Sequence, residues 1–162
     1  MILPAKLPPV FHLDTVADLL HVNSAAVMDL IDSGKILFAW NVSAPRASRR
    51  EIRILSSAVR DYLESKPSSV ATLGQAVASI LTDPGKFPAM AVIKASVFRR
   101  RLRVEHQLMG QLIRAGELKC KSGPRRPVSA ILTWESCSAW LHRRSLGPQS
   151  YAPIRPQRKG LV

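Results

Sequence analysis

Apolar residues near the start of the chain recur at helical spacing. Four of them fall at positions i, i+3, i+4 and i+7, which lie on one face of a helix: Leu13, Val16, Ala17 and Leu20. Asn23 then interrupts the pattern, and its side chain is suited to cap a second helix over residues 24–33. Gly34 supplies the positive φ at which such a helix can end. The pattern predicts two short helices joined by a tight turn.

Strand-like patterning follows this helix pair. Residues 36–42 are rich in β-forming side chains, and after a polar stretch with several arginines the segment Ile52–Ile54 alternates. The two segments predict a hairpin with a basic tip, here called a wing. Arg53 lies between two isoleucines and is predicted to face away from the core. A closing helix is expected next, capped by Ser56 or Ser57.

The chain contains an internal repeat. Val22–Ile36 aligns without a gap with Val104–Leu118 at an offset of 82 residues. Ile54–Leu63 aligns with Leu132–Leu141 at an offset of 78 residues. The change of offset shortens the intervening loop by four residues in the second copy, and surface loops tolerate such changes. The repeat predicts that the order helix, turn, helix, hairpin, helix occurs twice.

The predicted fold is therefore mainly α-helical with small β-hairpin wings, in two tandem units. The first unit spans residues 9–66 and the second unit spans residues 91–144, and residues 67–90 form a linker that contains a short helix over Val70–Leu81. This helix either packs on both units and fixes their mutual angle or belongs to a mobile connection. Residues 145–162 are rich in proline and basic residues, so we expect a disordered basic tail.

Positive charge is concentrated in the second half of the chain. The formal net charge is +13; residues 1–66 carry 8 Lys and Arg against 7 Asp and Glu, whereas residues 67–162 carry 16 against 4. A chain this basic attracts polyanions at long range. The second half is therefore expected to hold the surface that meets a nucleic acid.

The first unit resembles a known family. The resemblance rests on Phe11–Asn23, Leu30–Ile36 and Ile52–Leu63, which are similar to the excisionase-like winged helix-turn-helix domains, relatives of the DNA-binding part of MerR-type regulators. With the second copy it covers about two thirds of the chain. Members of this family place their second helix in the major groove and lay the wing on a neighbouring backbone or minor groove, often bending the duplex.

The resemblance implies a sequence-specific double-stranded-DNA-binding protein of a bacterium or its phages. Its role would be recombination directionality, as in excisionases, or transcription regulation. The expected partner is double-stranded DNA, and a recombinase, RNA polymerase or other protein can bind through the first unit. Two tandem units can replace the usual dimer, so the protein can act as a monomer on DNA or assemble on it cooperatively.

The second unit departs from the family pattern in its first helix. Arg99 and Arg101 stand at the positions that match Ala17 and Leu19 of the first unit. The helix therefore either shifts its register or presents a cationic face.

The first unit departs from the pattern in its groove-facing helix. That helix carries Asp29 and Asp32 and no Lys or Arg before Lys35, which is unfavourable chemistry next to phosphates. We expect the second unit to be the principal reader. The first unit then reads bases weakly or, as an adaptor, binds a protein.

Candidate base-reading residues lie on the second helix of each unit. Glutamine can bond adenine bidentately and arginine can do so with guanine. The candidates of the second unit are His106, Gln107, Gln111 and Arg114. The corresponding, weaker candidates of the first unit are Ser24, Ala25 and Met28. Surface helices often carry such residues without any such role.

Candidate contacts to the DNA backbone are cations of the wings and of the first helix of the second unit. They are Arg46, Arg49, Arg50, Arg53, Arg99, Arg100, Arg101, Arg103, Lys119, Lys121, Arg125 and Arg126. The alternative for these residues is a solvated charge run, but few acids balance them.

A third possibility is a nonspecific architectural protein, or one that binds single strands or RNA. The basic tail and Trp40 motivate it, because aromatic side chains can stack on bases. Trp134 and Trp140 share a helix face with apolar residues and are predicted to lie in the core instead.

The remaining chemistry-bearing residues predict no catalytic or cofactor site. Cys120 and Cys137 lack the spacing of a zinc site, and we interpret both as small core residues. No phosphate-binding loop, nucleophile elbow or zinc-protease motif occurs in the sequence. We expect no enzymatic activity, no metal, no cofactor and no membrane partner, and a cytoplasmic location at the nucleoid.

Overall fold

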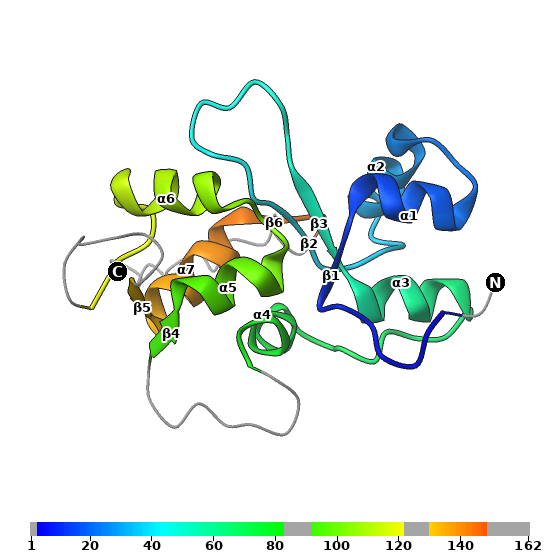
Figure 1. Cartoon of the computed structure of the whole chain (residues 1–162). Coiled ribbons are helices and arrows are strands. Elements are labelled where there is room, and N and C mark those ends of the chain that lie inside the picture. Colours follow the sequence, from blue (N-terminus) through cyan, green and yellow to red (C-terminus); the bar gives the residue numbers. More distant parts are fainter. Residues whose placement is uncertain (1–2, 83–91, 122–129, 149–162) are drawn as a thin grey trace, which may run out of the picture.

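The computed structural model describes residues 3–82, 92–121 and 130–148, in which helices alternate with short antiparallel strands (Figure 1). The first unit contains β1 (Val10–His12), α1 (Leu13–Leu20), α2 (Ser24–Asp32), β2 (Ala39–Asn41), β3 (Ile52–Leu55) and α3 (Ser56–Leu63). The linker contains α4 (Leu73–Leu81). The second unit and its end contain β4 (Val92–Lys94), α5 (Ala95–Leu102), α6 (His106–Arg114), β5 (Ile131–Thr133), α7 (Trp134–Arg144) and β6 (Ser145–Leu146).

The predicted helix pair of the first unit is confirmed. Asn23 caps α2 as expected, because its Oδ1 accepts a hydrogen bond from the Ala26 N–H at 2.8 Å. Gly34 has a φ of 76°, the left-handed conformation that ends the helix without a steric penalty. Val16, Ala17, Val27 and Ile31 are buried between the two helices and the sheet.

The predicted wing hairpin is also confirmed, whereas the predicted cap of the closing helix is wrong. β2 and β3 pair antiparallel, with Trp40 opposite Arg53. Helix α3 starts directly after β3 without a side-chain cap. The Ser56 N–H instead donates to the Pro9 carbonyl at 3.1 Å, because the unpredicted strand β1 pairs with β3 and brings Pro9 to the start of α3.

The backbone repeats as the sequence does. β4, α5 and α6 lie 82 residues after β1, α1 and α2, and β4 pairs with β5 in the register in which β1 pairs with β3. Arg103 repeats the left-handed turn of His21, with φ of 53° and 56°, and Gly116 repeats that of Gly34, with φ of 75° and 76°. The helix pair thus has one backbone conformation in both units.

The second hairpin is described only at its base. Cys120 forms a bridge with Leu132, and the Lys121 N–H donates to the Ile131 carbonyl at 2.8 Å. The predicted tip, with Arg125 and Arg126, lies outside the described residues.

The linker helix α4 begins three residues later than predicted. Thr72 and Gln75 form a reciprocal capping box there, which satisfies two free N–H groups at the helix start. Ala76, Val77 and Ile80 are buried, and α4 packs on α5 and α7. Its residues belong to a core that also includes Leu55 and Ala58 of the first unit, so α4 is a packed part of the fold.

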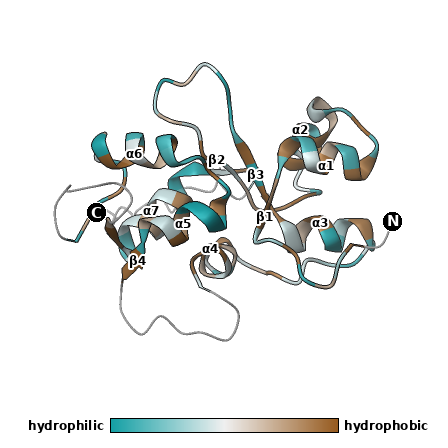
Figure 2. Ribbon diagram, viewed as in Figure 1, coloured by the Kyte–Doolittle hydropathy of each residue, from teal (hydrophilic) through white to brown (hydrophobic). Residues whose placement is uncertain are grey.

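The sheet of the first unit is buried on both faces. Phe11, Ala39 and Ile54 face α1 and α2, whereas Val10, Trp40 and Leu55 belong to the core of the second unit. Figure 2 shows hydrophobic segments in these strands and hydrophilic segments on α6 and on the loop between β2 and β3. One core therefore joins residues from both units.

The prediction of a disordered tail is wrong for its first residues. Ser145 and Leu146 form β6, which pairs with β2 opposite Trp40 and Ala39 and extends the sheet to the order β1-β3-β2-β6. The edge of β2 has free backbone groups that β6 can bond, and this pairing partner is invisible in the local sequence pattern. Residues 149–162 lie outside the described part of the chain.

Candidate nucleic-acid interface

Helix α6 presents a polar face to solvent. All four candidate base readers on it are exposed: His106, Gln107, Gln111 and Arg114. The opposite face buries Leu108, Met109, Leu112 and Ile113, which hold the helix in place. The apolar positions recur at helical spacing, so the same sequence pattern fixes both the buried face and the exposed one.

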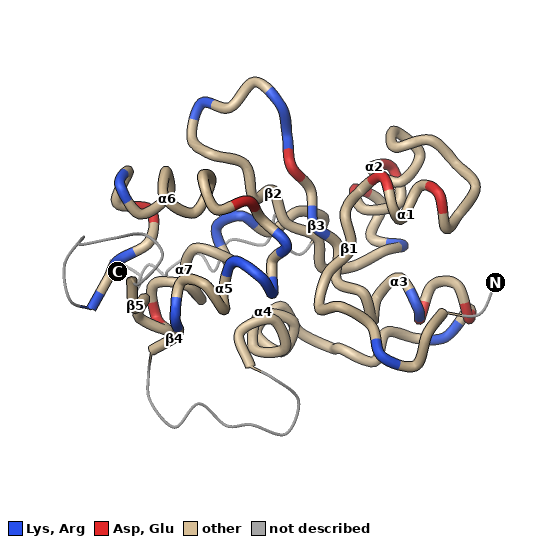
Figure 3. The backbone as a smooth tube through the Cα atoms, in the orientation of Figure 1, with Lys and Arg blue, Asp and Glu red and all other residues tan. Residues whose placement is uncertain are grey.

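Exposed arginines precede α6. Arg100 lies in the last turn of α5, where the negative end of the helix dipole stabilises a cation. Its Nε donates to the Ser96 carbonyl at 3.4 Å. Arg103 is exposed and forms the turn between α5 and α6. Figure 3 shows basic segments along α5 and in this turn, below α6 in that view. The predicted cationic face of the second unit is therefore present in part.

Arg99 and Arg101 differ from the prediction of free phosphate contacts. Arg101 donates to the carbonyls of Ile80, Ser79 and Thr82, the last two at 2.8 and 3.2 Å. These are the carbonyls that the C-terminus of α4 leaves unpaired, so Arg101 joins α5 to α4. Arg99 is half-buried and donates to the Val104 carbonyl at 3.4 Å. Helix α5 keeps its register, because the long side chains of Arg99 and Arg101 carry their guanidinium groups out of the apolar core.

The prediction that Arg53 contacts the DNA backbone is wrong. Arg53 does face away from the helices of its own unit, as the strand alternation predicts, but the second unit covers that face and only 5% of Arg53 is exposed. Its Nε donates to the Leu102 carbonyl at 3.0 Å and its Nη2 to the Arg103 carbonyl at 2.9 Å. Nη2 also pairs with Glu51 at 3.2 Å. Arg53 therefore connects the two units and is not accessible to DNA.

The electrostatic surroundings of Arg53 follow from this burial. Burial lowers the pKa of Arg53, and Glu51 opposes that shift as its ion-pair partner. Burial also lowers the pKa of the neighbouring His12, and the charges of Arg53 and Arg103 lower it further. An uncharged His12 avoids adding a further positive charge to these arginines.

The loop between β2 and β3, residues 42–51, carries the three remaining wing candidates. Arg46, Arg49 and Arg50 are exposed, and Arg46 has a left-handed φ of 64°. Asn41 anchors the loop, because its Oδ1 accepts hydrogen bonds from the Ser43 N–H at 3.1 Å and from Ser43 Oγ at 2.6 Å. The cations stand on a loop with a fixed base.

The two described cations of the second wing are also exposed. Lys119 and Lys121 flank the bridge at Cys120, on the segment that follows α6. They lie at the base of the hairpin whose tip falls outside the described residues.

The candidate readers of the first unit are poorly placed for base contacts. Ser24 Oγ donates to Asp14 Oδ1 at 3.1 Å, and Met28 packs partly against the core. Ala25 is exposed but has no polar group. Asp29 and Asp32 are both exposed on the same helix. The surface of α2 is therefore acidic.

A crevice lies where the two units meet. It has a volume of about 420 Å³ and is lined by His12, Leu13, Asp14, Arg49, Arg50, Glu51, Ile52, Arg53, Arg103 and Glu105. Arg49 and Arg50 from the first-unit loop share it with Arg103 from the turn before α6. This juxtaposition of cations from both units was absent from the sequence prediction, because no local pattern relates residues more than 50 positions apart.

The tryptophans take no part in this surface. Trp40 and Trp140 are fully buried, and Trp140 contacts Phe98 edge to face with a centroid distance of 6.1 Å. Trp134 is half-buried and packs against the same core. Trp140 therefore lies in the core as predicted, and burial leaves Trp40 unable to stack on a base.

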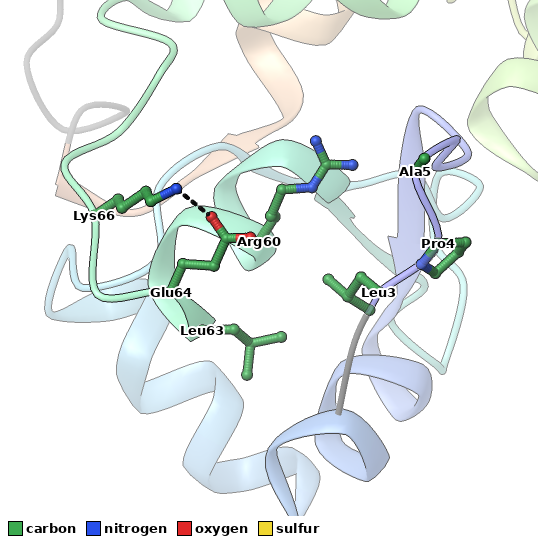
Figure 4. A pocket seen from close by; sticks show the side chains of 7 residues that line it. All are labelled: Leu3, Pro4, Ala5, Arg60, Leu63, Glu64 and Lys66. Atoms are coloured by element: carbon green, nitrogen blue, oxygen red, sulfur yellow. Dashed lines mark ion pairs between the residues drawn. The ribbon is translucent and has the colours of Figure 1, made fainter.

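Two further hollows line the first unit. One, between the N-terminal segment and the end of α3, has a volume of about 590 Å³. Figure 4 shows the side chains that line it: Leu3, Pro4, Ala5, Arg60, Leu63, Glu64 and Lys66. Glu64 and Lys66 form an ion pair at 3.0 Å within it. The neighbouring hollow, of about 340 Å³, includes Lys66 and Tyr62.

In the described residues, no group of three or more His, Cys, Asp or Glu side chains could hold a metal ion. None of the helices described is long and apolar enough to cross a membrane. No family model, no curated protein and no solved structure matches this chain.

Proposed function

We propose that this protein binds double-stranded DNA with α6 in the major groove. The observation that carries the proposal is the exposed face of α6, where His106, Gln107, Gln111 and Arg114 stand on a helix fixed by its buried side. These side chains match the donors and acceptors of base edges in the major groove. Arg100, Arg103, Lys119 and Lys121 stand on the segments before and after α6 and supply phosphate contacts.

The architecture behind this proposal is a pair of winged helix-turn-helix units. The repeated helix pair, the β2–β3 hairpin and the closing helices α3 and α7 support it. The resemblance to excisionase-like domains then suggests that the protein positions or bends DNA so that a recombinase or RNA polymerase assembles differently. The chain would act at the nucleoid without enzymatic activity of its own, and its two units would replace the two protomers of a dimer.

Selection of bound duplexes from a random library tests the proposal. The wild type is compared at physiological salt with a variant in which Gln107, Gln111 and Arg114 are replaced by alanine. We expect a motif that the wild type enriches and the variant loses or relaxes, since base contacts carry the sequence information. Tight binding without any motif would instead identify a nonspecific architectural protein.

A second candidate function is an adaptor whose first unit binds a protein. Four exposed acids on α1 and α2 favour it: Asp14, Asp18, Asp29 and Asp32. The double substitution Asp29→Lys, Asp32→Lys should then abolish capture of the recombinase or polymerase by immobilised protein and leave DNA affinity intact. A loss of DNA affinity in this variant would argue that α2 itself contacts DNA.

A further inference from the structure

We infer that the 42–51 loop of the first unit completes the DNA site of α6 in the second unit. The wing that serves α6 would then come from the other unit of the same chain. This inference rests on the proposed function, and it adds that one duplex runs from the exposed face of α6 across Arg103 to Arg49 and Arg50.

A buried side chain ties the loop to the start of α6. Arg53 lies on β3, the strand that follows the loop. Its guanidinium donates to the carbonyls of Leu102 and Arg103 at 3.0 and 2.9 Å. These two carbonyls end α5 directly before the turn into α6. The loop base and the start of α6 are therefore held together by hydrogen bonds from one guanidinium, which limits their relative movement.

The lining of the crevice places cations of both units beside one another. Arg49 and Arg50 from the loop and Arg103 from the turn share it, and only Asp14, Glu51 and Glu105 oppose their charge there. Glu51 is already paired with Arg53, and Ser24 already donates to Asp14. A phosphate group would offset the repulsion among the arginines, and arginine binds phosphate through paired N–H donors.

The negative charge on α2 disfavours a DNA site made by this loop together with the second helix of its own unit. Asp29 and Asp32 are exposed on α2, and Lys35 is the first cation after the helix. Phosphates that approach α2 would meet these carboxylates, whereas α6 carries Arg114 and begins three residues after Arg103. The described charges thus favour a duplex on the side of α6, with the first-unit loop as its second contact.

Affinity cleavage tests this arrangement. An iron chelate that cleaves nearby DNA is attached to a cysteine introduced by Ser48→Cys in the exposed loop, in a Cys120→Ser background that leaves only the buried Cys137. We expect cuts at one fixed position beside the α6 motif, within about one helical turn of the duplex. A matched probe on α2, introduced by Asp32→Cys, should give no cuts at that position.

The outcomes separate this inference from the proposed function. If the labelled protein binds no duplex in a fluorescence anisotropy titration, both fail. If it binds and protects a motif that depends on Gln107 and Gln111, but the Ser48→Cys probe cuts nowhere near it or cuts as the Asp32→Cys probe does, the inference alone is overturned.

A charge-removal pair gives an independent measurement. The variant Arg49→Ala, Arg50→Ala removes two exposed cations from the loop. The control Lys6→Ala, Lys35→Ala removes one exposed cation before the first unit and one after α2. The plot of log affinity against log salt has a negative slope, to which each phosphate contact contributes about 0.9. We expect the loop variant to have a slope smaller in magnitude by about 1.8. Equal slopes in the loop variant and the control would overturn the inference.

Discussion

At the scale of the residue, Arg53 holds together parts of the chain that lie far apart. Its guanidinium is buried and donates to Ile52, Leu102 and Arg103 carbonyls as well as to Glu51. Removing the cation leaves buried carbonyls without a hydrogen-bond partner, and the desolvation of such unpaired groups destabilises the fold.

We therefore expect Arg53→Met to lower the free energy of unfolding by about 3 kcal/mol, at the lower end for a broken buried pair because Glu51 is partly exposed. Urea denaturation followed by circular dichroism measures it. The matched variant Arg50→Met, on the exposed loop, should change stability by less than about 0.5 kcal/mol. Equal stability of the two variants would contradict the role assigned to Arg53.

The two thiols should differ in reactivity. Burial raises the pKa of the buried Cys137 to about 12, and it also raises the pKa of the half-buried Cys120. Only the thiolate reacts with iodoacetamide, and at pH 8 the Cys137 thiolate is about one part in 10,000. We expect native protein to be alkylated at Cys120 and denatured protein at both positions, as read by mass spectrometry. Rapid labelling of a native Cys120→Ser variant would contradict the burial of Cys137.

At the scale of the element, two equivalent glycines allow a matched comparison. Gly34 and Gly116 end α2 and α6 with φ of 76° and 75°. A Cβ at Gly34 would meet Pro148 Cγ at 3.1 Å, whereas a Cβ at Gly116 would have no neighbour within 4 Å.

Both alanine variants should lose about 1 kcal/mol to left-handed strain, and Gly34→Ala should lose more because of the clash with Pro148. Removing the chain after Gly147 should abolish that difference. Thermal unfolding of the four proteins provides the comparison, and a difference that survives the truncation would contradict the contact between Pro148 and the end of α2.

Sequence patterns predicted those elements whose signals are local. The spacing of Leu13 to Leu20 and the cap at Asn23 are properties of neighbouring residues, and so is the alternation around Arg53. The strands β1 and β6 were not predicted, because two or three residues hold no pattern and their pairing with β3 and β2 is decided by distant parts of the chain.

The same distinction applies to the candidate site. The exposure of His106, Gln107, Gln111 and Arg114 follows from helical spacing and was predicted, whereas Gly110, predicted to be exposed, is buried. The burial of Arg53 and the engagement of Arg101 with α4 depend on which surfaces the two units bury against each other, and alternation within one strand or helix does not contain that information.

At the scale of the whole molecule, one of the two apolar clusters contains residues of both units. Trp40, Val10 and Leu55 of the first unit lie in the same apolar cluster as Phe98 and Trp140 of the second. Such a shared core favours a single cooperative transition over independent unfolding of two units.

We expect tryptophan fluorescence from either unit to report the same unfolding transition as circular dichroism. Trp134→Phe, Trp140→Phe leaves Trp40 on β2 as the probe, and Trp40→Phe leaves the probes on α7. For each variant, the fluorescence transition is compared with its own circular dichroism transition. Fluorescence midpoints that differ from the circular dichroism midpoint would contradict a shared core.

The central claim is that this basic chain binds duplex DNA. Its most direct test is an anisotropy titration of a labelled duplex that carries the selected motif, at physiological salt, in which unlabelled duplex, single strand and structured RNA compete at equal concentration. We predict that only the duplex displaces the probe and that affinity falls steeply with salt. Displacement by single strands or RNA to the same extent, or no binding of the duplex, would contradict the account.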